Sequence, residues 1–236
     1  MSLIKKPILI KNSYKYKNID IDILNHEYVI HIPGDGNCLY TSIIVSILYN
    51  CKKHKSFQLI KYLLVQIINL LRNDMNYYDS FLINKFIDIN NKYYNNNNYI
   101  NNILQFFNNN KLYKIYNKIY YYLNSIEYDD DDIIDNILNN NTYIISFIIA
   151  LRFIIYKYYI DNIEKEMFMV DDLPFFLLYG EYGQEIDIYI ISHMLKININ
   201  YNIILNDNIL KICKSKYNKI YTCNLIYENK HYDLLL

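Results

Sequence analysis

Residues 27–48 read EYVIHIPGDGNCLYTSIIVSIL, and this stretch decides how the fold can be built. Residues 27–32 are rich in β-branched and aromatic side chains, which predicts a strand. Residues 33–37 hold one proline and two glycines, and these residue types favour a tight turn. From Cys38 onward, apolar residues recur at helical spacing, so the sequence predicts a helix that begins at this cysteine.

The elements that follow complete a mixed pattern. A second amphipathic helix is predicted at residues 56–71, and another at 184–195, where apolar residues again recur at helical spacing. Four further strands are predicted, at residues 197–205, 209–214, 220–227 and 231–236. We therefore expect an α+β (or α/β-type) domain in which a small mixed sheet is flanked by helices.

Residues 76–165 differ from the rest in composition, because asparagine-rich patches alternate with segments of Tyr, Ile and Leu. This pattern predicts an inserted, mostly helical region with exposed loops, carried by a single domain over residues 1–236. Its most apolar segment, residues 143–160, is interrupted by Arg152 and Lys157. The charge-free part is too short to span a bilayer, so we expect a core helix there.

The composition excludes several classes of protein. The chain has 236 residues, of which 53% are hydrophobic, and its 24 basic and 24 acidic residues give a formal net charge of zero. A general nucleic-acid clamp or an electrostatically held membrane protein needs a basic face, so neither partner is expected. The four cysteines form no CxxC pair, which argues against a zinc site or a disulfide scaffold and favours a reducing, cytoplasmic compartment.

The candidate chemistry lies at Cys38. Two glycines in the preceding turn allow several backbone N–H groups to point into one small space. The start of a helix favours a thiolate over a thiol, and nearby N–H groups can stabilise an oxyanion. These are the needs of a cysteine nucleophile that attacks a carbonyl group. The alternative is a plain turn followed by a buried cysteine.

A cysteine nucleophile also needs a base, which has to come from elsewhere in the chain. Five histidines are available: His26, His31, His54, His193 and His231. In the strand predicted at residues 231–236, alternation puts His231 and Asp233 on one face, where a carboxylate can orient an imidazole. His231 is the best candidate base, and His31, on the strand that enters the turn, is its nearest rival.

Three segments in a fixed order resemble the ovarian-tumour (OTU) family of deubiquitinating cysteine proteases. Residues 35–40 read DGNCLY and resemble the cysteine box of that family. Residues 182–199 read YGQEIDIYIISHMLKINI. They match the aromatic-Gly pair of the family, the helix with an acidic residue that this pair opens, and the strand that follows. Residues 231–233 read HYD and match its last strand. The chain departs from the family at Tyr182, where tryptophan is usual, and at Thr41, where a basic residue is common.

The resemblance implies a role for each matching residue. Cys38 would be the nucleophile, His231 the general base and later acid, and Asp233 the residue that orients His231. Asp35 would shape the oxyanion site together with the backbone around Gly36 and Asn37. Tyr182 and Tyr232 would border a narrow channel for the Gly-Gly end of the substrate.

The resemblance also implies a substrate and a setting. The family hydrolyses the isopeptide bond after the C-terminal glycine of ubiquitin, so ubiquitin, polyubiquitin or a ubiquitin-like modifier would be the partner. The reaction needs neither a metal nor an organic cofactor, and we expect a cytoplasmic monomer (in the host cytoplasm if the source is viral).

Two other hypotheses stay open. The chain could be a catalytically inactive OTU-like module that binds ubiquitin, with its cleft distorted or blocked by the insertion. It could also be a structural protein in which the three segments are accidents of composition. The scarcity of glycine and histidine argues against such accidents, because the chain has 4 Gly and 5 His in total.

Overall fold

The structure is a computed structural model, and it describes residues 8–11, 15–16, 19–20, 28–32, 34, 36–54, 58–60, 62–63, 117, 141–162, 182–205, 208–213 and 221–235. The chain divides into two compact units. One consists of Met1–Ser2 and Phe57–Glu181, and the other consists of Leu3–Ser56 and Tyr182–Leu236. The second unit brings together the two ends of the chain that carry the three family-like segments.

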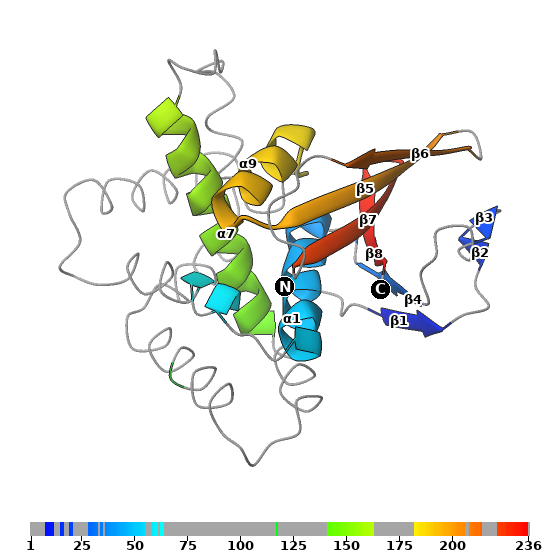
Figure 1. Cartoon of the computed structure of the whole chain (residues 1–236), viewed down its shortest axis with the longest axis horizontal. Helices are drawn as coiled ribbons and strands as arrows, with labels where there is room; N and C mark the ends of the chain where they lie inside the picture. Colours follow the sequence, from blue (N-terminus) through cyan, green and yellow to red (C-terminus); the bar gives the residue numbers. More distant parts are fainter. Residues whose placement is uncertain are drawn as a thin grey trace, which may run out of the picture. The chain divides into compact units, whose positions relative to one another are not determined.

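The main element of this second unit is a six-stranded mixed sheet (Figure 1). Its strands are β1 (Ile8–Lys11), β4 (Tyr28–His31), β5 (Asn198–Leu205), β6 (Asn208–Cys213), β7 (Thr222–Glu228) and β8 (His231–Leu235), in the spatial order β1-β4-β8-β7-β5-β6. Strands β5 and β7 are parallel, and all other neighbours are antiparallel. The short strands β2 (Lys15–Tyr16) and β3 (Ile19–Asp20) pair separately.

The pairing of β4 with β8 places the two strands of the candidate site side by side. Val29 lies opposite Leu235 and Ile30 lies opposite Leu234, and all four side chains are buried. This pairing joins the strand before the cysteine turn to the last strand of the chain.

A two-residue hairpin connects β7 to β8 and sets where β8 begins. Asn229 and Lys230 both have positive φ, at 50° and 64°, as a type I′ turn requires. Because Glu228 and His231 close this hairpin, His231 is the first residue of β8.

Two helices pack on the sheet in this unit. Helix α1 (Cys38–His54) packs against β7 and β8, and helix α9 (Glu185–Leu195) contacts β5 (Figure 1). The first turn of α1 closes with a hydrogen bond from the Thr41 N–H to the Asn37 carbonyl at 2.9 Å. Every residue from 38 to 48 is buried, so the N-terminal half of α1 lies in the core.

The other unit contains α7 (Asn141–Asn162), which covers the core helix predicted at residues 143–160. Nearly every residue of α7 whose burial is described is buried, including Leu151 and Arg152.

Within the ranges described above, no helix is long and apolar enough to cross a membrane. Apart from Asn117 and α7, the predicted insertion at residues 76–165 lies outside the described residues, and the single domain over the whole chain stays a prediction.

The predicted α+β class is confirmed, with the helices at 38–48 and 184–195 and all five predicted strands found within a few residues of their expected places. The helix predicted at 56–71 is helical at the described residues 58–60 and 62–63, and its remaining residues lie outside the described part. The sequence did not indicate β1. This strand has four residues and pairs with β4 at the edge of the sheet, where short, lysine-containing strands carry a weak pattern.

Candidate active site

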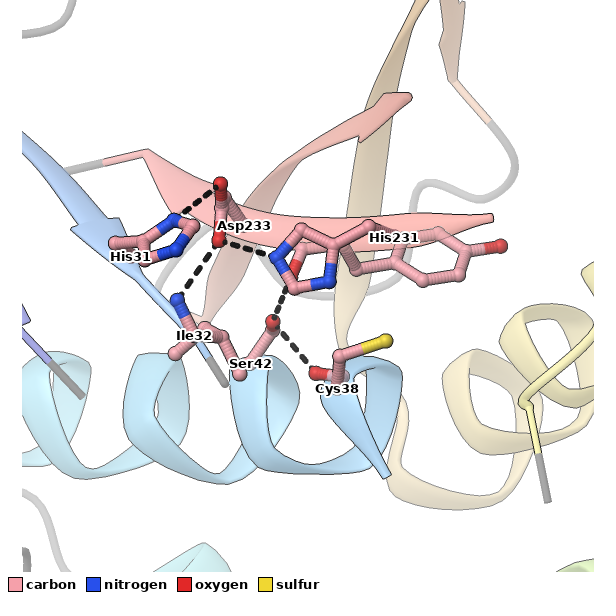
Figure 2. A network of polar contacts seen from close by, with 7 residues as sticks. His31, Ile32, Cys38, Ser42, His231 and Asp233 are labelled. Atoms are coloured by element: carbon pink, nitrogen blue, oxygen red, sulfur yellow. Dashed lines mark hydrogen bonds and ion pairs between the residues drawn. The ribbon is translucent and has the colours of Figure 1, made fainter. Parts of the chain in front are cut away.

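Cys38 is the first residue of α1 and is fully buried. One turn further along, the Ser42 hydroxyl donates to the Cys38 carbonyl at 2.7 Å and lies 3.4 Å from the Tyr232 carbonyl (Figure 2). Ser42 therefore ties the first turn of α1 to the backbone of β8, the strand that carries His231 and Asp233.

The turn before Cys38 has the backbone that a glycine-rich segment predicts. Gly36 has a φ of 81°, in the region that side-chain-bearing residues rarely adopt. A Cβ atom added at Gly34 would lie 3.5 Å from Nδ1 of His231, so the backbone at Gly34 lies directly beside the imidazole. Asn37 is buried, while Asp35, expected to shape the oxyanion site, lies outside the described residues.

His231 and Asp233 face each other, as their alternation along one strand predicts. Nε2 of His231 lies 2.9 Å from Oδ1 of Asp233, whose side chain is fully buried. The backbone N–H of Ile32 donates to the same oxygen at 2.7 Å. The carboxylate is thus fixed from two sides, and the other ring nitrogen of His231, Nδ1, lies on the side of Cys38 (Figure 2).

His31 contacts the other oxygen of the same carboxylate. Its Nδ1 atom lies 3.0 Å from Oδ2 of Asp233, and its ring centroid lies 5.5 Å from that of His231. Figure 2 shows Asp233 between the two imidazoles, with His231 on the side of Cys38. In this arrangement His31, considered above as a rival base, has Asp233 as its polar contact, and its side chain is 53% exposed.

The surroundings of His231 favour its protonated form. The hydrogen bond that His231 donates to Asp233 is the largest cause, the interaction with Cys38 comes next, and together they raise the pKa of His231 from 6.5 to about 10 against the opposing effect of burial. A protonated imidazole stabilises a neighbouring thiolate. The site therefore places a protonated imidazole beside the sulfur of Cys38.

Two other cysteines lie in the part of the chain that the structure describes. Burial raises the pKa of Cys223 to about 12, which keeps this sulfur protonated at neutral pH. Cys51 is also buried, and it forms no disulfide. Of these three sulfurs, Cys38 is the one with an imidazole beside it.

The Tyr182–Gly183 pair lies next to the first turn of α1. A Cβ atom added at Gly183 would clash with the side chain of Leu39, because it would lie 2.9 Å from the Leu39 Cβ atom. Glycine is therefore needed for this close packing. Tyr182, just before it, is exposed. Leu39 directly follows Cys38 in the sequence. The contact between Gly183 and Leu39 therefore holds the backbone next to Tyr182, a residue predicted to border the channel.

Tyr232, the second predicted channel residue, is buried. Its ring lies 4.7 Å from that of Tyr227, and burial raises the pKa of its hydroxyl well above the ordinary value.

Two other histidines considered above lie on helices: His54 is exposed near the end of α1, and His193 stacks on Tyr189 along α9. His26 lies outside the described residues.

Several contacts that organise the site could not be predicted from the sequence. Ser42, the backbone of Ile32 and the pairing of His31 with Asp233 all depend on contacts between residues far apart in the chain. One contact of Ser42 could have been predicted, because a serine hydroxyl in a helix can donate a hydrogen bond to the carbonyl four residues earlier.

Comparisons with known proteins reveal a likeness of fold. No protein-family model matches the chain, and no curated protein does. The fold is similar to that of OTUB1 in a solved structure of h/ceOTUB1 with ubiquitin aldehyde and UBCH5B~Ub. The two chains are 16% identical in sequence and superpose with a TM-score of 0.57, and the match covers 97% of this chain and 88% of that one. A ceOTUB1 complex with ubiquitin aldehyde and UBC13~Ub shares 14% identity and a TM-score of 0.56 over 100% and 94% of the two chains.

A third structure, of h/ceOTUB1 with ubiquitin aldehyde and UBC13~Ub, gives 16% identity and a TM-score of 0.57, with 97% and 89% of the chains covered. The chain therefore has an OTUB1-like α+β fold, which confirms the likeness that the three sequence segments indicate.

Proposed function

We propose that this chain is a deubiquitinating cysteine protease that hydrolyses isopeptide bonds after the C-terminal glycine of ubiquitin or a ubiquitin-like modifier. The observation that carries the proposal is the chain of contacts from Asp233 through His231 to Cys38 at the start of a helix. Support also comes from the fold, because the similar OTUB1 structures contain ubiquitin aldehyde.

The first half of the reaction would transfer the acyl group to the enzyme. The Cys38 thiolate attacks the glycine carbonyl carbon, and the carbonyl electrons move to oxygen. Backbone N–H groups of the turn around Gly36 would stabilise this oxyanion, with Asp35 shaping the turn. When the C–N bond breaks, protonated His231 donates its proton to the leaving lysine amine, and a thioester on Cys38 remains.

The second half would release ubiquitin. His231, now neutral, accepts a proton from a water molecule as the water attacks the thioester. The C–S bond breaks, the Cys38 thiolate re-forms beside protonated His231, and the glycine carboxylate leaves. Asp233 would keep the imidazole oriented through both steps, because the Ile32 N–H holds its carboxylate.

The proposal is tested by incubating the full chain with a ubiquitin C-terminal electrophile. We expect one adduct per chain, located on Cys38 by peptide mass spectrometry. Cys38→Ala should form no adduct, whereas Cys223→Ala should form it as the wild type does. An adduct that persists in Cys38→Ala would overturn the assignment.

One observation favours a second candidate, a module of the same fold that binds ubiquitin without cleaving it. Cys38 is fully buried, so a substrate reaches the sulfur after the segments around it have moved. In that case the chain would bind ubiquitin in a titration, form no electrophile adduct, and leave di-ubiquitin intact at enzyme concentrations that exceed the substrate.

A further inference from the structure

Three metal-ligating side chains meet at the outer side of the candidate active site. His31, His231 and Asp233 each offer one ligand atom, and these atoms all lie within 4.8 Å of one another. We propose that these three residues form a Zn²⁺ site whose occupation switches the enzyme off. The binding of zinc follows from the geometry alone, and the inhibition rests on the proposed function.

The set of ligands matches the preference of zinc. Two imidazole nitrogens and one carboxylate oxygen are a common zinc environment, with metal–ligand distances of about 2.0–2.2 Å. Tetrahedral ligands at such distances lie about 3.4 Å apart. The distance of 3.0 Å between Nδ1 of His31 and Oδ2 of Asp233 needs to open by a few tenths of an ångström, and the remaining ligand atoms, which all lie within 4.8 Å of one another, need to close to this spacing.

The two imidazoles have to approach each other, and His31 has the freedom to do so. Its side chain is 53% exposed, whereas that of His231 is 21% exposed and that of Asp233 is fully buried. A cation from solvent therefore meets His31 first, and rotation of this one side chain can complete the site. The less exposed His231 and the fully buried Asp233 stay in place.

A supporting contact fixes the buried carboxylate. The Ile32 N–H donates to Oδ1 of Asp233 at 2.7 Å, which holds the carboxylate in the orientation that points Oδ2 toward His31. Hydrogen bonds of this kind raise metal affinity by holding the ligand in place. Hard cations such as Mg²⁺ and Ca²⁺ prefer oxygen ligands, so two nitrogen ligands select against them.

Occupation of this site would stop proton transfer. When Zn²⁺ takes the lone pair on Nε2 of His231, the proton of that nitrogen passes to solvent. The neutral ring then carries its remaining proton on Nδ1, the nitrogen that serves Cys38. Such a ring has no lone pair left to accept a proton from the attacking water, so the second half of the reaction stops. The ring is also neutral, and loss of its Nδ1 proton would leave an imidazolate, so it is a far weaker acid toward the leaving lysine amine than an imidazolium.

Binding is tested without activity in the full chain carrying Cys38→Ala, because the thiol is itself a zinc ligand and has to be removed. Competition for Zn²⁺ against a chromophoric chelator should show one ion per chain. Adding His31→Ala should weaken the affinity at least about tenfold, since one of three protein ligands is lost. Adding His54→Ala, the control at an exposed histidine on α1, should not change it. No binding, or equal binding with and without His31, overturns the site.

Inhibition is tested in the chain that retains Cys38, with each variant compared with its own rate without zinc. Zinc should block ubiquitin cleavage reversibly, EDTA should restore it, and Mg²⁺ or Ca²⁺ should have no effect. His31→Ala should raise the half-inhibitory Zn²⁺ concentration at least about tenfold. If zinc inhibits the wild type and His31→Ala equally, the Cys38 thiol holds the metal, and the proposal is overturned. A chain that cleaves nothing counts against the proposed function, while the chelator competition still decides the site.

Discussion

The Tyr40 hydroxyl donates to Oδ2 of Asp187 at 2.9 Å, joining the first turn of α1 to the first turn of α9. Both residues are buried. The Gln184 N–H donates to the same oxygen at 2.8 Å, so one carboxylate holds both helix ends. This link fixes the segment with Tyr182 and Gly183 beside Cys38, the arrangement that a channel for an extended substrate requires.

Tyr40→Phe should therefore destabilise the fold. It removes one hydrogen bond from a buried carboxylate, and the free energy of unfolding should fall by about 1–3 kcal/mol. Urea unfolding measures this change. Tyr189→Phe is the matched control, because Tyr189 lies exposed on α9, and it should change stability by less than about 0.5 kcal/mol. Equal effects of the two substitutions would show that the link is not needed.

Gly183→Ala should lower cleavage more than it lowers stability. The new Cβ atom would approach the Leu39 Cβ atom to 2.9 Å and clash with the end of that side chain, so residues 182–183 have to move away from α1. We expect a higher KM for a ubiquitin substrate, because exposed Tyr182 moves with its neighbour. Adding Leu39→Ala removes the outer atoms of the clash and should partly restore KM. No change in KM in the single variant would contradict a role in substrate binding.

Cys38→Ala should abolish cleavage of di-ubiquitin and leave the fold intact. The lost side chain is small, so the free energy of unfolding should fall by about 1 kcal/mol. Cys223→Ala removes a buried thiol whose pKa is raised to about 12, and cleavage should persist. Gel assays of both variants, with thermal unfolding as a check, decide the point. Persistent cleavage by Cys38→Ala, with loss in Cys223→Ala, would make the assignment wrong.

The pH dependence should report the contact between Asp233 and His231. The pKa of His231 is raised to about 10, chiefly by Asp233, so the alkaline limb of kcat/KM should lie near pH 10. Asp233→Asn removes the negative charge and should move this limb to lower pH, with a smaller loss of rate than His231→Ala causes. His31→Ala keeps that charge and should move the limb less. An alkaline limb that stays in place in Asp233→Asn would contradict this explanation.

The same shift makes a prediction for stability. Because the pKa of His231 in the folded chain exceeds the ordinary value of 6.5, its stabilising contribution is fully present below pH 6.5. That contribution is lost as the pH rises through about 10. The difference in unfolding free energy between the wild type and His231→Gln should therefore shrink from pH 6 to pH 10. A difference that is constant across this range would show that His231 contributes by packing alone.

Local pattern predicted those parts of the site that depend on neighbours in sequence. The helix that begins at Cys38 follows from the glycine-rich turn, and the facing of His231 and Asp233 follows from alternation in a strand. The position of His31 did not follow, because its contact with Asp233 spans 202 residues and requires the pairing of β4 with β8. Register between distant strands is set by the whole core, which no short segment encodes.

Helix α7 tests whether the predicted insertion belongs to one cooperative domain. Leu151 is fully buried near the middle of this helix, so Leu151→Asp places an unpaired charge in a packed interior and should unfold the surrounding structure. If residues 1–236 form one domain, this substitution should abolish ubiquitin cleavage as well, and urea unfolding of the wild type should show a single transition. Asn162→Gln, which keeps an amide at the last, partly exposed residue of α7, is the control and should leave both unaltered. A Leu151→Asp chain that stays soluble and cleaves ubiquitin would show that the insertion folds apart from the catalytic unit.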